Sequence, residues 1–261
     1  MSGINIYKVK DKKEKFYTDK GLLFNLPFRI LMVGKSQFSG KSSCIVNLLL
    51  QDDKRLYKNE FDGDNIYIFS GSLKTDNKMK LLIKQFDIPE SNLFEEYSEE
   101  ALEAIYELTE EEYEEAMEEK ERPKNTLVIL DDLAFGGDLK KKNAGMINKI
   151  FCNGRHINLS IIATAQKYGG QLHTTQRENC SGIILWDCSD KQLDLIADDH
   201  NILEDKKSFK KMFRKRTEKP FSFMVVNYSN PRSQRYLSMN FEPIGSCGRT
   251  KSEGCPCFPS S

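Results

Sequence analysis

The chemistry that this sequence can support begins at Gly40, Lys41 and Ser42, which follow the apolar run Phe28–Val33 and open a stretch with helical apolar spacing. The backbone N–H groups of such a loop form a nest for anions at the positive end of the next helix. Gly40 permits close backbone approach, Lys41 supplies a cation for the β- and γ-phosphates, and the Ser42 hydroxyl suits magnesium. The segment therefore predicts a P-loop that binds ATP and Mg²⁺. The residues expected to contact the nucleotide are Gly34, Lys35, Ser36, Gln37, Phe38, Ser39, Gly40, Lys41, Ser42 and Ser43.

The spacing of this loop departs from the usual pattern. A glycine is expected five positions before Gly40, where this chain has Lys35, and Gly34 stands one position earlier. Either Gly34 starts a longer loop or Lys35 replaces the first glycine. The alternative to a P-loop is an ordinary strand–turn–helix in which Lys41 is solvated.

A second motif ends the apolar segment Thr126–Leu130 with Asp131 and Asp132. This is the form of a Walker B motif, in which Asp131 would hold magnesium and Asp132 would orient or deprotonate the attacking water. Two aspartates at a strand end can instead simply begin a turn. With a P-loop upstream, we expect Lys41 and Asp132 to be catalytic and Ser42 and Asp131 to be metal ligands.

Two further candidate catalytic residues flank the apolar run Leu159–Thr164. Gln166, just after it, would sense the γ-phosphate if this strand lies between the P-loop strand and the Walker B strand. Otherwise it is a polar residue that enters a loop. Arg155, just before the run, is a candidate arginine finger, a cation that stabilises charge on the γ-phosphoryl group. Its place at a helix end would suit the site of a neighbouring subunit, although surface arginines are also common near helix C-termini.

The elements that must position these residues alternate along the chain. Short apolar runs rich in β-branched residues alternate with helical stretches, which indicates an α/β fold with a mostly parallel sheet flanked by helices. The expected strands are Phe28–Val33, Asn65–Phe69, Thr126–Leu130, Leu159–Thr164, Gly182–Leu185 and Phe221–Val226. The expected helices are Lys41–Leu50, Lys78–Phe86, Glu99–Glu119, Asn143–Asn153, Lys191–Ala197 and Ser208–Lys215.

Composition limits what else the chain can be. Its 261 residues are 39% hydrophobic, which allows one main core, and the formal net charge of zero gives no argument for nucleic acid or membrane. No apolar run has the length of a signal peptide core or a membrane span, so we expect an intracellular chain that does not enter a membrane. Any binding surface must therefore come from a local cluster of charge.

The predicted organisation is an N-terminal arm (1–25), an ATPase domain (26–230) with an acidic helical insertion at about 90–123, and a C-terminal tail (231–261). The acidic helix is expected to pack one face on the core, with an acidic docking surface as the alternative. The chain has seven cysteines, an odd number, and disulfides are not implied. Four of them lie in or beside apolar segments, where we expect reduced, buried thiols, namely Cys44, Cys152, Cys180 and Cys188. Cys247, Cys255 and Cys257 in the tail could ligate zinc, but no fourth ligand stands at a familiar spacing.

Together the motifs resemble the FtsK–HerA superfamily of DNA-pumping ATPases, and most closely the genome-packaging ATPases of large DNA viruses. The likeness rests on GKSQFSGKS, LVILDD and especially GRHINLSIIATAQ, and it covers roughly residues 25–230. It implies a RecA-like sheet, a ring of identical subunits such as a hexamer or pentamer, and ATP hydrolysis that drives double-stranded DNA through the pore. It also implies a capsid or portal protein as a further partner, and a place in the host cytoplasm, viral factory or virion.

A motor of this kind must hold DNA through its phosphates. The dense basic segment Lys206–Arg216 is one candidate surface, with a solvated helix as its alternative, and Lys140, Lys141 and Lys142 are another. Two rival functions remain open: another P-loop enzyme, such as a helicase or phage-assembly ATPase, and a scaffold that binds ATP as a switch. Duplex DNA should stimulate the motor, single strands should stimulate a helicase, and the scaffold should bind ATP with little turnover.

Overall fold

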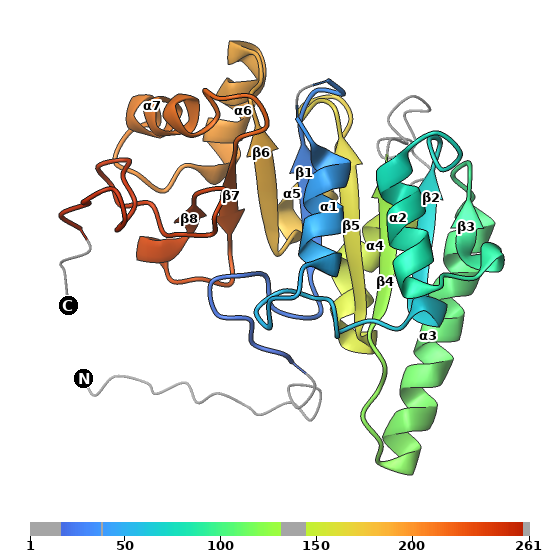
Figure 1. Ribbon diagram of the computed structural model, residues 1–261. Coiled ribbons are helices and arrows are strands. Elements are labelled where there is room, and N and C mark those ends of the chain that lie inside the picture. The colour runs from blue at the N-terminus through green and yellow to red at the C-terminus, as the bar shows by residue number, and fades with distance from the viewer. Residues whose placement is uncertain (1–16, 38, 132–144, 258–261) are drawn as a thin grey trace, which may run out of the picture.

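The computed structural model describes residues 17–37, 39–131 and 145–257. Within these ranges the chain forms an eight-stranded sheet in the order β3-β2-β4-β5-β1-β6-β7-β8 (Figure 1). The strands are β1 Arg29–Val33, β2 Ile66–Ser70, β3 Leu93–Phe94, β4 Thr126–Asp131, β5 Leu159–Ala165, β6 Gly182–Trp186, β7 Phe223–Asn227 and β8 Tyr236–Leu237. The first six in chain order run parallel, whereas β7 and β8 are antiparallel to their neighbours.

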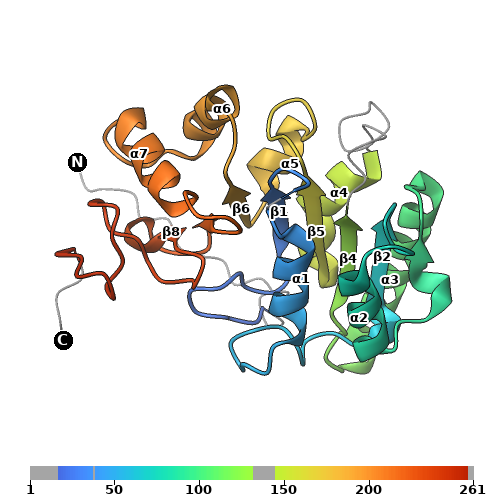
Figure 2. The same cartoon turned by 45° about the horizontal axis from the view of Figure 1, so that its top comes forward.

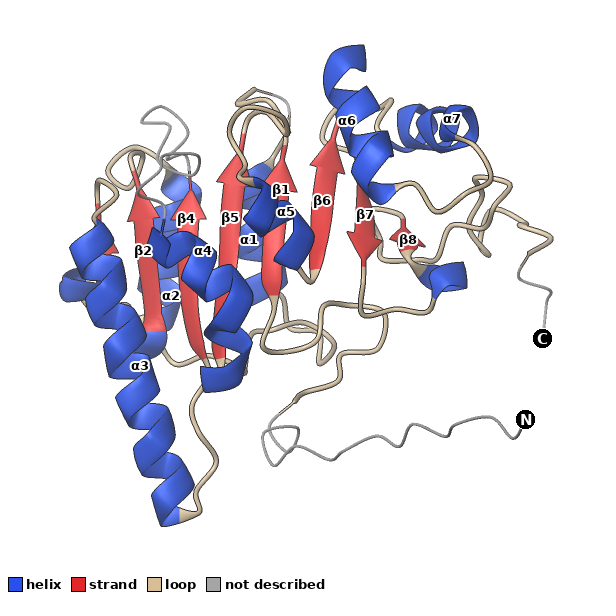
Figure 3. Ribbon diagram, turned by 180° about the vertical axis from the view of Figure 1, so that it is seen from behind, coloured by secondary structure: helices blue, strands red, loops and turns tan. Residues whose placement is uncertain are grey.

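Helices cover both faces of this sheet. Helices α1 (Lys41–Leu50) and α2 (Asn77–Phe86) pack on one face, and α3 (Glu99–Glu119), α4 (Gly145–Asn153) and α5 (Thr174–Asn179) lie on the other, which Figure 3 views from the front. Helices α6 (Asp190–His200) and α7 (Lys206–Arg216) add to the second core. Alternate strand residues feed the two cores, so that Ile30 joins the first and Leu31 the second. Burial on both faces explains why the parallel strands are almost continuously apolar.

The P-loop strand and the Walker B strand are not neighbours. Strand β5 pairs with β1 on one side, where Val33 faces Ala165, and with β4 on the other, where Thr126 faces Leu159. Strand β5 therefore lies between them, which was the condition for the predicted role of Gln166. Because these strands are parallel, their carboxyl ends and the loops that follow gather at one edge of the sheet (Figure 2).

The predicted fold class and the six predicted strands are confirmed, with ends that shift by one or two residues. Three short elements were missed, namely β3, α5 and β8, and α6 and α7 are longer than expected. Helix α7 begins earlier because the Asp205 carboxylate accepts a hydrogen bond from the Ser208 N–H at 2.7 Å and caps it. Strand β7 begins at Phe223 rather than Phe221, because Phe221 has a φ of 67°, which a strand cannot contain. The predicted residues Asn143 and Ala144 of α4 lie outside the described residues.

The acidic helix α3 has the predicted bounds. The Ser98 hydroxyl caps it by accepting from the Ala101 N–H at 3.0 Å. Its buried residues end at Tyr113, and the part beyond extends past the sheet in Figure 3. From the apolar spacing of this helix we expected Leu108 to face the core, and this was wrong. Leu108 is 45% exposed, and Thr109 takes the buried position. The helix packs on the core at least as far as Tyr113, and a docking role for its acidic surface stays a prediction.

The region that we expected to be an irregular tail contributes to the sheet. Tyr236 and Leu237 form β8, which pairs with Val226 and Val225, and both residues are buried. A two-residue strand carries too little periodicity to be recognised in a sequence. The division of the chain into arm, domain and tail stays a prediction.

Candidate nucleotide site

The predicted P-loop joins β1 to α1 at the carboxyl edge of the sheet. Gly40 adopts a left-handed conformation (φ 79°, ψ 28°) directly before α1, which glycine adopts without steric cost. The Lys41 ammonium donates to the carbonyl oxygen of Gly34 at 2.6 Å and to that of Lys35 at 3.3 Å. Lys41 is thus held against the inner side of its own loop, with a residue exposure of 8%. This places a cation where the β- and γ-phosphates of a nucleotide would lie in a P-loop.

Gly34 takes the place of the first glycine of the motif. A Cβ atom on Gly34 would lie 2.8 Å from the Ser39 Cβ and 2.9 Å from the Trp186 Cβ, closer than real contacts allow. The Gly34 N–H also donates to the Ala165 carbonyl at 3.0 Å, so it continues the ladder between β1 and β5. Lys35 is exposed and lines a neighbouring cleft. This geometry favours the longer loop over replacement of the first glycine by Lys35.

Asp131 links three elements beneath the loop. It is the last residue of β4, and one carboxylate oxygen (Oδ2) lies 3.3 Å from the hydroxyl of Ser42 in α1. The other oxygen (Oδ1) accepts from the Thr164 hydroxyl of β5 at 2.9 Å. Asp131 is only 2% exposed, so these contacts hold its orientation. A hydroxyl and a carboxylate side by side are the hard oxygen donors that Mg²⁺ prefers.

An open cleft of about 350 Å³ adjoins this pair. On one side it is lined by Lys41, Ser42 and Asp131, and on the other by residues around the start of α2, including Asp76 and Lys78. The loop is therefore not filled by side chains, and an anion has room to enter. The complete lining is Ser36, Ser39, Gly40, Lys41, Ser42, Ser43, Ser72, Thr75, Asp76, Lys78, Asp131 and Phe221.

Some of the other predicted site residues lie near this cleft, but they do not line it. Gln166 directly follows β5 beside the base of the loop, and its N–H donates to the Gln171 Oε1 at 2.9 Å, but it does not line the cleft. Lys35 and Gln37 line a cleft of about 610 Å³ on the far side of the loop. Phe38 and Asp132 lie outside the described residues. The roles predicted for Phe38 and Asp132 stay predictions.

Arg155 lies at the opposite edge of the sheet. It belongs to the short 3-10 helix Gly154–Ile157 that precedes β5, and Leu159 pairs with Thr126 at the start of β4. At about 3.3 Å per residue, the length of β4 alone separates that edge from Asp131 by about 17 Å. Arg155 is exposed and makes no ion pair with another described residue. It therefore cannot serve the site of its own chain.

Thr164 and Phe221 were missed as site residues. Thr164 occurs within the GRHINLSIIATAQ motif, and the need of a buried carboxylate for a donor was the signal that could have found it. Phe221 is 57% exposed, and its ring lies 3.4 Å from the position of a Cβ on Gly40. It lines the phosphate cleft, the cleft beside Lys35 and a third cleft of about 550 Å³ along α1. No local sequence signal marks this position.

The basic helix α7 divides into two rows of charge. Lys206 and Lys210 form ion pairs with Asp198 and Asp194, and Arg214 contacts Asp187 at 2.5 Å and Asp190 at 2.6 Å. The adjacent row holds Lys207, Lys211 and Lys215, which are exposed and make no ion pair with another described residue. Residues four apart share a helix face, so this second row is a cationic stripe. The other candidate surface, at Lys140, Lys141 and Lys142, lies outside the described residues.

Comparisons with known proteins bear on these observations. Residues 13–235 match the family described as Poxvirus A32 protein. The chain belongs to the poxvirus A32 protein family. No curated protein matches it. The match extends over both Walker motifs and over the GRHINLSIIATAQ motif of this A32 family member, and it confirms the predicted resemblance.

Solved structures show the fold of this A32 family member. The genome packaging NTPase B204 from Sulfolobus turreted icosahedral virus 2, in complex with AMP, has a TM-score of 0.55 at 16% identity, covering 81% of this chain and 96% of that one. The DNA-packaging ATPase B204 from Sulfolobus turreted icosahedral virus has a TM-score of 0.51 at 12% identity, covering 82% and 97%. The pCW3 conjugation coupling protein TcpA reaches 0.50 at 14% identity, covering 78% and 58%. The fold is that of RecA-like P-loop ATPases.

None of the helices in the described part of the chain combines the length and the apolar character that a membrane span requires.

Proposed function

We propose that this chain is an ATP-hydrolysing motor that translocates double-stranded DNA to package a viral genome. The observation that carries the proposal is the contact between Ser42 and Asp131 beside an open P-loop, with Lys41 inside the loop. Membership in the poxvirus A32 family supports the viral role, as does a fold shared with the genome packaging NTPase B204 and the DNA-packaging ATPase B204 of two Sulfolobus viruses.

The residues divide the work of hydrolysis among them. Lys41 would exchange its carbonyl contacts for phosphate oxygens, and Ser42 and Asp131 would hold Mg²⁺. Thr164 fixes the Asp131 carboxylate for this role. When bound, Mg²⁺ neutralises charge on the β- and γ-phosphate oxygens. Asp132 orients or deprotonates the attacking water, and Gln166 senses the γ-phosphate. These residues account for in-line attack on the phosphoryl group without any covalent intermediate.

Phe221 supplies a platform for the adenine base. Its exposed ring lies next to Gly40, at the point where the phosphate cleft meets the cleft along α1. The cleft along α1 is also lined by Phe223 and Phe241. An aromatic face stacks on a base without requiring hydrogen bonds. The backbone of Phe221 is in the left-handed region, φ 67°, which a bulky residue adopts only under constraint from its surroundings.

Arg155 completes the site of the next subunit. It lies at the sheet edge remote from its own P-loop, and it is exposed and makes no ion pair with another described residue. A cation so placed can reach a γ-phosphate only across a subunit boundary, which a homo-oligomeric ring of five or six subunits would provide. The capsid or portal partner, and a place in the host cytoplasm, viral factory or virion, belong to the same proposal.

The deciding experiment measures ATP hydrolysis by the purified chain with and without duplex DNA, together with its solution mass. Duplex DNA should raise the rate and single strands should raise it less, and Lys41→Ala should abolish turnover. Asp132→Asn should retain ATP binding and lose turnover. ATP binding without turnover in the presence of duplex DNA would support a switch scaffold instead, and preference for single strands would support a helicase.

The stripe of Lys207, Lys211 and Lys215 offers a matched test of the DNA surface. Lys207→Gln with Lys211→Gln removes two unpaired charges, whereas Lys206→Gln with Lys210→Gln removes two that are already paired on the same helix. Two lost phosphate contacts should lower the slope of log affinity against log salt by about 1.8. The control pair should leave the slope nearly unchanged. Equal effects of both pairs would exclude this stripe as the DNA contact.

A further inference from the structure

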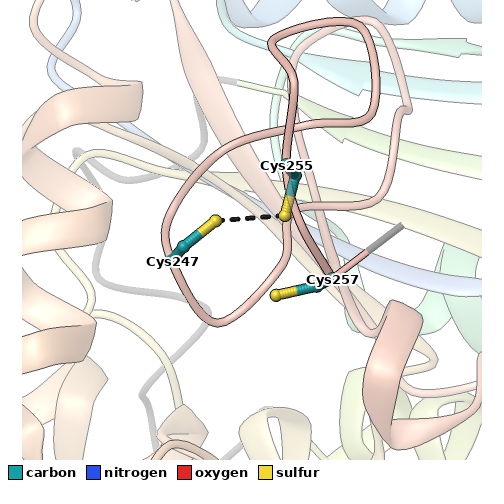
Figure 4. Close-up of side chains that lie close together, drawn as sticks. All are labelled: Cys247, Cys255 and Cys257. Atoms are coloured by element: carbon teal, nitrogen blue, oxygen red, sulfur yellow. Dashed lines mark hydrogen bonds between the residues drawn. The ribbon is translucent and has the colours of Figure 1, made fainter. Parts of the chain in front are cut away.

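Three cysteine side chains converge outside the nucleotide site. The sulfur atoms of Cys247, Cys255 and Cys257 all lie within 4.8 Å of one another. Figure 4 shows the three thiols directed toward a common point, with the Cys247 and Cys255 sulfurs 3.0 Å apart. The other four cysteines are Cys44, Cys152, Cys180 and Cys188, and none of them belongs to this cluster.

The backbone of this segment is built so that the thiols can meet. A Cβ atom on Gly245 would lie 2.4 Å from the Cys255 sulfur and 2.9 Å from the Cys257 Cβ, so only glycine fits there. Gly248 and Gly254 adopt left-handed conformations, with φ of 74° and 73°, in the two turns between the cysteines. The turns are closed by hydrogen bonds from the Gly248 N–H to the Gly245 carbonyl at 2.8 Å and from the Cys255 N–H to the Thr250 carbonyl at 3.1 Å.

A mostly buried arginine ties the cysteine segment, a hairpin of residues 245–257, to the end of α7. The Arg216 guanidinium donates to the Gly248 carbonyl at 2.5 Å and forms an ion pair with Glu253, and the Arg216 side chain is only 10% exposed. Glu253 in turn accepts from the Thr250 N–H at 2.9 Å. The hairpin therefore has a defined place on the ATPase fold, although only Gly248, Thr250 and Cys255 of residues 246–257 are buried. So small a core does not by itself stabilise a hairpin of this length.

We propose that Cys247, Cys255 and Cys257 bind a zinc ion as thiolates. Three sulfur ligands favour borderline or soft ions over the magnesium used at the nucleotide site. On binding, each thiol loses its proton to solvent and forms a zinc–sulfur bond, and a water or an outside donor takes the fourth tetrahedral position. The ion would replace a hydrophobic core beneath the hairpin and hold it against α7. This site is separate from the nucleotide cleft, so its failure would leave the proposed ATPase activity untouched.

The test begins with the full chain, purified in reducing buffer without chelators. Elemental analysis should find about one zinc per chain, and Cys257→Ser should lower zinc affinity by more than about tenfold, since even outer contacts of a metal site are worth that much. Cys247→Ser and Cys255→Ser should do the same. Cys152→Ser, which removes a thiol from α4, should retain the zinc.

A second measurement protects the test from variants that fail to fold. Addition of Co²⁺ to zinc-depleted wild-type protein should give a sulfur-to-metal charge-transfer band that zinc then displaces, and that thiol alkylation before metal addition abolishes. Wild-type protein that holds no zinc and gives no such band would overturn the proposal. So would an intact mass that reveals a Cys247–Cys255 disulfide after purification under these reducing conditions.

Discussion

Replacement of Thr164 by valine isolates the part of the site that orients Asp131. The substitution keeps the side-chain shape in a position that is 1% exposed and removes the hydroxyl that donates to Asp131 Oδ1 at 2.9 Å. A hydrogen bond to a charged group contributes about 1.5–3 kcal/mol, and loss of contacts behind a metal ligand costs about 10- to 100-fold in metal affinity or activity. We therefore expect Thr164→Val to raise the Mg²⁺ concentration for half-maximal ATP hydrolysis by about 10- to 100-fold.

The assay is ATP turnover against Mg²⁺ concentration at fixed ATP, with thermal unfolding measured in parallel. Thr164→Ser keeps a hydroxyl at the same place and should stay within a few-fold of wild type. A purely structural role for Thr164 would lower the unfolding temperature without moving the Mg²⁺ dependence. An unchanged Mg²⁺ midpoint in a well-folded Thr164→Val protein would refute the assignment of Asp131 as a ligand that Thr164 orients.

Three further predictions concern separate parts of the molecule. Phe221→Ala should raise the KM for ATP by about 10- to 100-fold, because stacking on a base is worth about 1–3 kcal/mol. Phe221→Tyr keeps an aromatic ring and should leave the KM nearly unchanged. A wild-type KM in Phe221→Ala would show that the ring does not contact the base. Arg155→Ala subunits mixed with Lys41→Ala subunits should recover part of the ATPase activity, and no recovery at any ratio would contradict action across subunits. Burial lowers the pKa of His200 to about 4, against 6.5 in the unfolded chain, while Asp199 raises it and Arg177 lowers it. Only the unfolded chain takes up this proton at intermediate pH, so stability should fall by about 2 kcal/mol between about pH 7 and about pH 5. His200→Gln should remove that loss in denaturant titrations, with His173→Gln as the control, and an unchanged pH dependence would show that His200 is not its source.

The sequence was sufficient to predict those helices and strands whose apolar residues recur regularly over many positions. Helix α1 begins at Lys41 and helix α3 spans Glu99–Glu119, as predicted, because a glycine in the first and a capping serine in the second mark their starts. The buried parallel strands were recognisable because both of their faces are covered. Helix α5 was missed because it has six residues and is capped by the His173 side chain, an unusual cap.

The candidate site was predictable where its residues belong to a recognisable motif, and not where the fold alone brings residues together. Ser42 and Asp131 were assigned to one metal, and they lie 3.3 Å apart although 89 positions separate them. Phe221 reaches the P-loop only because β7 follows β6 in the sheet order and a left-handed residue directs the chain there. That proximity depends on tertiary structure, and no spacing in the sequence encodes it.

Strand β5 connects the nucleotide site of its own chain to Arg155, the residue proposed to act in the site of the next subunit. Thr164 lies at its carboxyl end against Asp131, with Gln166 directly beyond, and Arg155 precedes its amino end. Because β5 is hydrogen-bonded along its length to β1 and β4, a shift at one end is transmitted to the other rather than absorbed by bending. In the proposed ring, loss of the γ-phosphate beside Gln166 would therefore displace Arg155, which belongs to the next site. In such a ring the strand would couple neighbouring subunits directly, so hydrolysis in one would change the readiness of the next without a separate relay.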